Sequence, residues 1–205
     1  NSELETKYFQ AREIELALAK ETIDPDDRIL DTIYFGGGTP SLANLDLLRA
    51  LLIKIREIFI FDRNLEFSFE INPESIDSDR LLALKELGIN RPIFGVQSFD
   101  RSLLKILNRK HNLEDTFRAA YLARALRFDN FGIDMIFGLP RQPGRKLSED
   151  LAQLLELNPP HISYYQLTIE KGTPLDTMVS AGNVKIPDSD LSAARRKNVP
   201  MLVGT

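Results

Sequence analysis

Three consecutive glycines end a short segment rich in β-formers, and they are the first residues in this chain that could do chemistry. Residues 31–35 run directly into Gly36, Gly37 and Gly38, and Thr39 follows. Glycine loses more backbone entropy on folding than any other residue, so adjacent glycines occur where bare backbone must approach a ligand or adopt positive φ. Glycines also form ordinary turns. The polar residues at the ends of later predicted strands favour a ligand site.

A polar side chain stands at the end of each later predicted strand. Glu70 ends the second strand, Gln97 the third and Tyr165 the fifth, while Asp134 lies within the fourth. The carboxyl ends of parallel strands meet at one edge of a sheet, where ligands bind in βα folds. Arg109 adds a guanidinium that either pairs with Asp134 or faces a ligand shared with it. Acceptors, amide donors and one cation suit a zwitterionic, hydroxylated ligand such as a nucleoside-linked amino acid.

Each of these positions also has a structural interpretation. Asp134 could be an exposed charge on an edge strand, but Ile133, Met135 and Ile136 around it are apolar and predict that it lies inside. A buried carboxylate needs a donor or a cation to offset desolvation. Gln97 could cap neighbouring backbone. The convergence of several such groups favours a polar pocket.

Other kinds of active site find less support in the sequence. His111 and His161 are the only histidines and lack the spacing of metal ligands. His161 begins a strand after two prolines, which favours a structural hydrogen bond. Residues 95–98 do not form a nucleophile elbow, and no Gly-Lys-Ser/Thr follows the three glycines. We therefore assign no catalytic residue and no metal ligand in this chain.

Helical and extended patterns alternate along the chain and would position these groups. Helices are predicted at 3–20, 45–61, 77–87, 102–108, 113–126 and 147–157, and strands at 31–35, 66–71, 91–96, 130–137 and 161–169. In the first helix, Leu4, Tyr8, Ile14 and Leu18 fall on one side and predict an amphipathic helix. Alternating βα units predict an α/β fold with a parallel sheet covered by helices, either a partial barrel or an open doubly wound sheet.

The composition limits the classes of protein to which this chain can belong. The chain has 205 residues, 43% of them hydrophobic, and a net charge of −4, which supports a real core and argues against nucleic-acid binding. No apolar run is long enough for a membrane span, and no export signal is present, so we expect a cytoplasmic location. Zero cysteines exclude disulfides, thiolate metal sites and iron–sulfur ligation by these residues. Because Asn is the first residue, we expect a fragment or a trimmed chain.

The same stretches resemble the radical S-adenosylmethionine enzymes, in particular the oxygen-independent coproporphyrinogen III oxidase-like family. The resemblance is carried by residues 34–42, 70–74, 88–100, 134–140 and 161–175. It implies a partial (β/α)6 barrel, truncated at both ends, with S-adenosylmethionine lying across its mouth. We expect residues 1–187 to form this barrel core. Residues 188–205 depart from the family and are expected to be a tail or the start of a C-terminal region, with a helix at 188–197.

The resemblance also implies which residues hold the cofactor. Gly37, Gly38 and Thr39 would contact the methionine moiety through their backbone, and Ile136 would pack near the adenine. The complete implied set is Gly36, Gly37, Gly38, Thr39, Glu70, Gln97, Arg109, Asp134 and Ile136.

Within the family, His111 after Asn108 and Arg109 resembles the haem-chaperone (HemW) branch, since the oxidase branch usually carries Gln there. The implied chemistry is one-electron reductive cleavage of S-adenosylmethionine to methionine and a 5′-deoxyadenosyl radical. In a haem chaperone, only a remnant of this chemistry would accompany the transfer of haem. The implied partners are S-adenosylmethionine, haem or porphyrinogen, and an electron donor, and the resemblance admits contact with a membrane or a haem-acceptor protein. Two alternatives stay open: a true oxidase that decarboxylates coproporphyrinogen III, and a non-catalytic haem-binding and delivery protein.

The sequence departs from the family at several points. The family holds a [4Fe–4S] cluster on a Cys-x3-Cys-x2-Cys motif, which would lie just before residue 1, so this chain alone is expected to be inactive. Arg127 and Arg141 stand where relatives usually have Gly, and positive φ is favoured at such helix ends. Pro92 removes a hydrogen-bond donor from a predicted strand.

Overall fold

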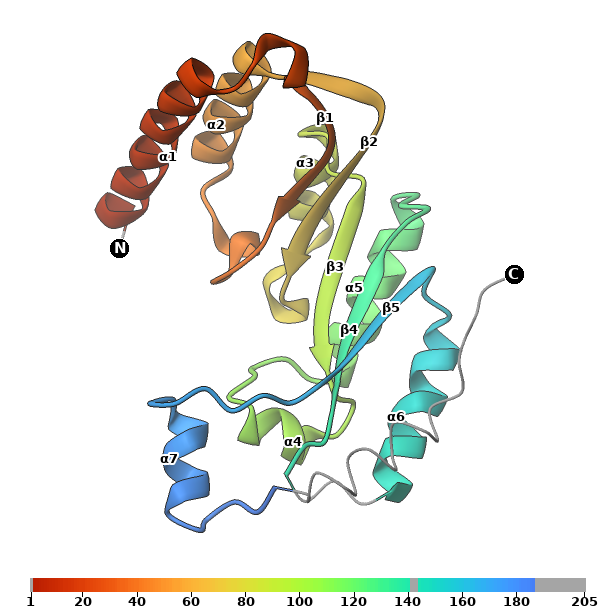
Figure 1. Cartoon of the computed structure of the whole chain (residues 1–205). Coiled ribbons are helices and arrows are strands. Elements are labelled where there is room, and N and C mark those ends of the chain that lie inside the picture. Colours follow the sequence, from red (N-terminus) through yellow and green to blue (C-terminus); the bar gives the residue numbers. More distant parts are fainter. Residues whose placement is uncertain (1, 141–143, 187–205) are drawn as a thin grey trace.

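Five parallel strands form one curled sheet in the computed structural model, which describes residues 2–140 and 144–186 (Figure 1). The strands are β1 (Ile29–Phe35), β2 (Ile60–Ile71), β3 (Arg91–Gln97), β4 (Gly132–Phe137) and β5 (His161–Gln166). Their order in the sheet is β1-β2-β3-β4-β5, the same as in the chain, and every neighbouring pair is parallel. All five carboxyl ends therefore lie at one edge, as the alternating pattern predicts.

Helices precede, connect and follow the strands: α1 (Ser2–Thr22), α2 (Leu45–Ile58), α3 (Ser78–Glu86), α4 (Arg101–Ile106), α5 (Leu113–Ala125), α6 (Gly144–Leu157) and α7 (Pro174–Ser180). Four of them begin at an Asn or Asp whose side chain accepts hydrogen bonds from backbone N–H groups of the first turn. These residues are Asn44, Asp77, Asp100 and Asn112. Such caps satisfy donors that have no partner within the helix, so helix starts are strongly encoded in this sequence.

The two faces of the sheet differ because successive side chains of a strand point to opposite sides. One face contributes large apolar side chains such as Phe67, Phe69 and Phe94 to a core shared with α2, α3, α5 and α6. On the other face, Glu70 and Asp134 are only half-buried. Parallel sheets are usually covered on both sides. This sheet is a half-barrel with a polar inner face.

The second strand is longer than the sequence predicts. Helix α2 ends at Ile58 rather than 61, and β2 begins at Ile60 rather than 66, pairing with Ile29 of β1. The polar residues 62–64 have poor β propensity and conceal the strand. Helix α7 is absent from our sequence prediction, although Thr173 caps it and Pro174 occupies its first position. The Thr-Pro pair was the signal for it.

The prediction for the first helix is wrong about which side is buried. Leu4, Tyr8, Ile14 and Leu18 are all more than half exposed, and the buried residue of α1 is Phe9. The helix contacts α2 and contributes Phe9 to the core, so its apolar residues do not form one continuous buried stripe.

Two of the unusual residues lie in the described part. Strand β3 runs unbroken through Pro92. Arg127 follows the end of α5 with a left-handed φ of 56°, a conformation that favours glycine and so explains why relatives usually have Gly at this position. Arg141 and the predicted helix at 188–197 lie outside the described residues. No helix among residues 2–140 and 144–186 has both the length and the apolar character needed to cross a bilayer.

Candidate functional site

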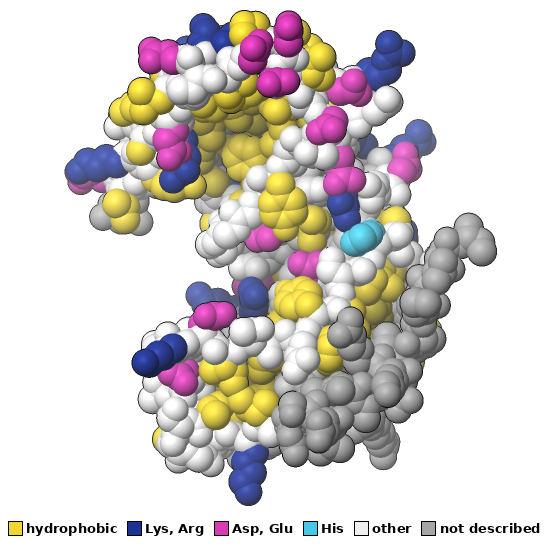
Figure 2. Space-filling view, in the orientation of Figure 1, with side chains coloured by type: hydrophobic (Ala, Val, Ile, Leu, Met, Phe, Trp, Pro, Cys, Tyr) yellow, Lys and Arg dark blue, Asp and Glu magenta, His cyan; other side chains and the backbone are white. Residues whose placement is uncertain are grey.

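A polar cavity of about 120 Å³ lies at the carboxyl ends of the strands. It is lined by Gly38, Thr39, Pro40, Glu70, Ile71, Asn72, Ile93, Gly95, Gln97, Arg109, Asp134 and Tyr165. Figure 2 shows charged side chains gathered in the hollow of this side of the molecule. Six of the nine predicted cofactor residues thus meet in one place: Gly38, Thr39, Glu70, Gln97, Arg109 and Asp134.

The glycine loop after β1 is shaped by Glu70. The carboxylate of Glu70 accepts a hydrogen bond from the Tyr34 hydroxyl at 2.6 Å and another from the N–H of Gly37 at 3.1 Å. A Cβ on Gly36 would lie 2.8 Å from Glu70 Oε1, so a larger residue here would force the Glu70 carboxylate to move. Gly37 and Gly38 have φ of 75° and 58° and open space where a side chain would stand. The loop therefore presents bare backbone beside the cavity.

Gln97 ends β3 in an unusual conformation. Its φ is 68°, a left-handed value that non-glycine residues rarely adopt, and it is 3% exposed. Its side-chain Oε1 accepts a hydrogen bond from the Tyr165 hydroxyl of β5 at 3.1 Å. The Gln97 side chain thus bonds across the cavity to β5, which does not support the alternative that it caps neighbouring backbone.

Asp134 and Arg109 line the same cavity, yet they do not form the ion pair considered from the sequence. Arg109 donates to Asn72 Oδ1 at 3.1 Å, and no salt bridge involving Arg109 occurs among the described residues. Asp134 Oδ1 is buried without a hydrogen-bond partner. Burial raises the pKa of Asp134, while a hydrogen bond from Ser163 acts in the opposite direction. The second interpretation, that both groups face a shared ligand, fits this arrangement.

Three further predicted residues lie away from the polar cavity. Gly36 and Gly37 line a neighbouring, larger cavity, and Ile136 packs with Leu103 and Leu139 in a small separate apolar cluster. Tyr34, which joins Glu70 to the edge strand, was missed from the sequence. Its position beside Phe35 made it look like one more apolar strand residue.

The two histidines have different surroundings. The His111 side chain is fully buried, with Nε2 2.9 Å from the carbonyl oxygen of Val96 and Nδ1 3.4 Å from Glu74 Oε2. His161 is exposed at the start of β5. Among the described residues, no group of three or more His, Cys, Asp or Glu is placed to hold a metal ion.

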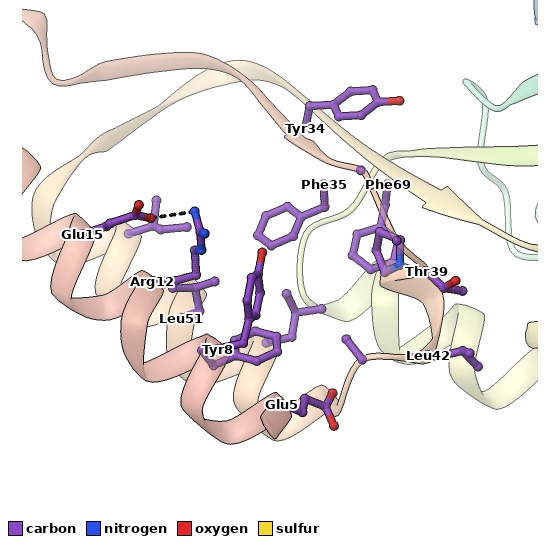
Figure 3. Close-up of a pocket in the computed structure, with 18 of the residues that line it drawn as sticks. Glu5, Tyr8, Arg12, Glu15, Tyr34, Phe35, Thr39, Leu42, Leu51 and Phe69 are labelled. Atoms are coloured by element: carbon purple, nitrogen blue, oxygen red, sulfur yellow. Dashed lines mark ion pairs between the residues drawn. The ribbon is translucent and has the colours of Figure 1, made fainter. Parts of the chain in front are cut away.

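The larger cavity measures about 990 Å³ and lies between α1, α2 and β1 (Figure 3). Its floor is apolar, and Tyr8 and Phe35 point toward one another across it. An Arg12–Glu15 ion pair of 2.6 Å lies on its α1 side. Because the polar strand-end groups converge elsewhere, the small polar cavity is the candidate site. Gly38, Thr39 and Pro40 line both cavities.

The residues of the polar cavity fit one of the two groups that the sequence resemblance implies and not the other. An orphaned carboxylate oxygen on Asp134, a guanidinium on Arg109 and open glycine backbone provide an acceptor, a cation and amide donors. This donor set fits a zwitterionic ligand such as S-adenosylmethionine. An iron–sulfur cluster takes thiolates, and these 205 residues contain no cysteine, so the residues present do not fit a cluster.

Comparison with known proteins identifies the family. The model of the radical SAM superfamily matches residues 4–155. The chain belongs to the radical SAM superfamily. Among curated relatives, it is 37% identical over 183 residues to the heme chaperone HemW of Haemophilus influenzae, covering 89% of this chain and 47% of the relative. It is 39% identical over 163 residues to HemW of Escherichia coli, covering 80% and 42%. The chain thus spans about half the length of the relatives it matches.

Two solved structures have the same fold. The structure of the Escherichia coli coproporphyrinogen III oxidase HemN matches with a TM-score of 0.80 and 28% identity, over 94% of this chain and 44% of that one. An archaeal Elp3 from Methanocaldococcus infernus matches with a TM-score of 0.69 at 18% identity, a likeness of fold alone. The predicted α/β half-barrel and the resemblance to the coproporphyrinogen oxidase-like family are therefore confirmed.

Proposed function

We propose that this chain is the S-adenosylmethionine-binding half-barrel of a HemW-type haem chaperone. The proposal rests on one observation above the others: Asp134, with a buried unpartnered oxygen, and Arg109, without a salt bridge among the described residues, line one cavity beside open glycine backbone. Buried polar groups normally have partners, so an orphaned carboxylate oxygen in a cavity supports the proposal that a ligand binds there. The 37–39% identity to HemW proteins supports the branch.

Each side chain of the cavity would have a distinct part in holding the ligand. Arg109 would bind the carboxylate of the methionine end, and Asp134 would accept hydrogen bonds from the ligand. Gly38 and Thr39 would contribute backbone contacts, while Glu70 holds the glycine loop in place through Gly37. In radical SAM proteins, bound S-adenosylmethionine supplies one-electron chemistry. The usual volume of a ligand pocket is about 300–1,000 Å³, so the ligand would also extend over the glycine loop.

His111, the residue that resembles the haem-chaperone branch, would not act as a haem ligand. Its side chain is fully buried and both ring nitrogens face protein atoms, Val96 O and Glu74 Oε2. In the haem-chaperone branch, His111 would then have a structural role. Any haem site would lie elsewhere in the complete protein.

The second candidate function is oxidative decarboxylation of coproporphyrinogen III. It is favoured by the TM-score of 0.80 to HemN and by 35% identity over 158 residues to an oxygen-independent coproporphyrinogen III oxidase from Paracoccus denitrificans. The chain covers only 35% of that relative. The lower identity in the HemN comparison and the His at position 111 make it the weaker candidate.

Calorimetric titration with S-adenosylmethionine tests the binding proposal. Asp134→Ala and Arg109→Ala should each weaken affinity by about 1.5–3 kcal/mol, the usual contribution of a hydrogen bond to a charged group. Lys110→Ala is the matched control, because this exposed neighbour also removes one positive charge. Thermal melts run in parallel. Unchanged affinity together with a large fall in melting temperature would mean that Asp134 and Arg109 are only structural.

The two functions are distinguished with the complete gene product, supplied with S-adenosylmethionine and a reductant under anaerobic conditions. We expect haem binding, seen as a Soret band that titrates to saturation. We expect no conversion of coproporphyrinogen III when the porphyrin products are separated by chromatography. Catalytic formation of protoporphyrinogen IX would replace the chaperone with the oxidase.

A further inference from the structure

The backbone at the end of β3 is held in a strained turn. Gln97 has a φ of 68°, and the N–H of Ser98 donates to the carbonyl of Val96 at 2.8 Å, which closes a γ-turn centred on Gln97. Turns of this hand are rare for residues with a side chain. The pairing between β3 and β4 also shifts register between Gly95 and Gln97. Such strained backbone persists only where the surroundings enforce it.

One side of this turn is held by a buried carboxylate on helix α6. Asp150 is 2% exposed and accepts two hydrogen bonds from the segment that follows Gln97. The Ser98 hydroxyl donates to one carboxylate oxygen at 2.9 Å, and the Phe99 N–H donates to the other at 3.0 Å. The Ser98 oxygen in turn accepts from the N–H of Asp100 at 3.1 Å, so the bonded segment continues to the cap of α4.

The other side of the turn is held by His111. A carbonyl oxygen can only accept, so the 2.9 Å contact with Val96 requires that His111 Nε2 carries the hydrogen. The ring is fully buried and its other nitrogen lies 3.4 Å from Glu74 Oε2, in the turn that follows β2. His111 is therefore bonded to the end of β3, while its Nδ1 lies near Glu74 Oε2 after β2 without forming a hydrogen bond to it.

Neither residue reaches the cavity itself. The lining includes Gln97 and Arg109 but neither Asp150 nor His111. Asp150 bonds to the residues directly after Gln97, and His111 bonds to the residue directly before it. Between these two anchors the Gln97 side chain reaches across to the Tyr165 hydroxyl.

We propose that Asp150 and His111 are positioning residues that hold Gln97 in its left-handed turn, with its amide facing the cofactor cavity. The inference rests on the proposed function, because it assumes that the cavity binds S-adenosylmethionine. It gives helix α6, which lies outside the site, and His111, which does not line the cavity, a role in positioning Gln97.

Variants of the two anchors test the proposal by calorimetric titration with S-adenosylmethionine. In Asp150→Asn the amide offers one acceptor oxygen in place of two, and affinity should fall about tenfold. His111→Leu should lose a similar factor, whereas His111→Gln, which keeps a side-chain N–H donor, should recover most of it. Leu154→Ala is the matched control, since Leu154 is buried one turn later on α6. It should lower the melting temperature and leave affinity within about twofold.

A second measurement does not depend on the ligand. Nuclear magnetic resonance of the unliganded chain reports the φ of Gln97 through its backbone coupling and the protection of the Phe99 amide from hydrogen exchange. Asp150→Asn should shift the first and reduce the second, and Leu154→Ala should change neither. If the wild-type chain binds no S-adenosylmethionine, the proposed function fails and this measurement alone decides the inference. Unchanged Gln97 coupling and Phe99 protection in Asp150→Asn, or equal loss of affinity in Leu154→Ala, would overturn it.

Discussion

Left-handed backbone at single residues separates structural from functional positions in this chain. Among the described residues, four that are not glycine have positive φ: Gln97, Asn108, Arg127 and Asn158. Asparagine tolerates this region and its two examples need no special explanation. Gln97 faces the polar cavity, whereas Arg127 merely follows the end of α5 on the surface. Strain at Gln97 is therefore expected to serve ligand binding, and strain at Arg127 is expected to be removable.

We predict that Arg127→Gly raises the free energy of unfolding by about 1 kcal/mol, since a Cβ in this conformation costs about 1–2 kcal/mol and glycine returns part of that as chain entropy. The backbone carbonyl of Arg127, which accepts from Lys85 Nζ at 3.1 Å, is retained in the variant. Urea denaturation measures the change. Asn158→Gly is the comparison and should gain less. A lower stability for Arg127→Gly would contradict the strain argument.

The second prediction at this scale concerns Asp134 and pH. Burial raises the pKa of Asp134 above its ordinary value of 3.8, so the folded state favours the protonated carboxyl. Stability from this group is then complete below pH 3.8 and is lost as pH rises through the folded pKa. Asp134→Asn should stabilise the unliganded chain at pH 7, and the gain should shrink as pH falls through the raised folded pKa and be smallest below pH 3.8. Melting temperatures across pH measure it, and a gain independent of pH would refute the burial explanation.

At the scale of elements, helix α1 departs most from its sequence pattern. An amphipathic reading groups Leu4, Tyr8, Ile14 and Leu18, yet all four remain exposed and Phe9 is the residue that joins the core. The helix packs mainly on α2 and borders the large apolar cavity beside β1. Its stability is therefore expected to depend on a narrow contact rather than on a broad apolar face.

Phe9→Ala should consequently destabilise the chain by about 3 kcal/mol, the lower end of the range for a buried aromatic, because the adjoining cavity already weakens its packing. Ile14→Lys should change the free energy of unfolding by less than about 0.5 kcal/mol, as expected for an exposed position. Chemical denaturation of both variants gives the comparison. A large loss in Ile14→Lys would restore the amphipathic interpretation of α1.

At the scale of the whole molecule, the chain is a half-barrel that carries a polar cavity at its strand ends and contains no cysteine. The polar inner face holds Glu70 and Asp134, and the curled sheet positions both at one rim. The chain spans about half the length of the curated HemW proteins it matches. Ligand binding can therefore be measured on these 205 residues without a cluster being present.

We predict that the 205-residue chain does not assemble a [4Fe–4S] cluster, because it contains no cysteine. Anaerobic reconstitution with iron and sulfide, followed by desalting, measures the iron that is retained. Retention should fall to the level of a protein without a metal site, with no charge-transfer absorption. Stoichiometric iron with cluster absorption would show that other ligands replace thiolates.

The sequence by itself determined the local features of this protein. Strand and helix alternation, the caps such as Asn44 and Asp77, and the glycines after β1 are encoded within a few residues, so they could be predicted without a structure. Because parallel strands end at one edge, the same pattern also predicted that Gln97, Arg109 and Asp134 would converge.

Only the tertiary structure decided how those groups are partnered. Glu70 bonds to Tyr34 and Gly37, and Arg109 bonds to Asn72 rather than to Asp134. Asp150, more than fifty positions along the chain, turned out to bond to Ser98. Such contacts join residues that are distant in sequence, and the side chain that fills each hydrogen-bonding position depends on the curl and register of the sheet. Local propensity carries no information about that geometry, whereas the requirement that buried polar groups find partners acts only once the chain is folded.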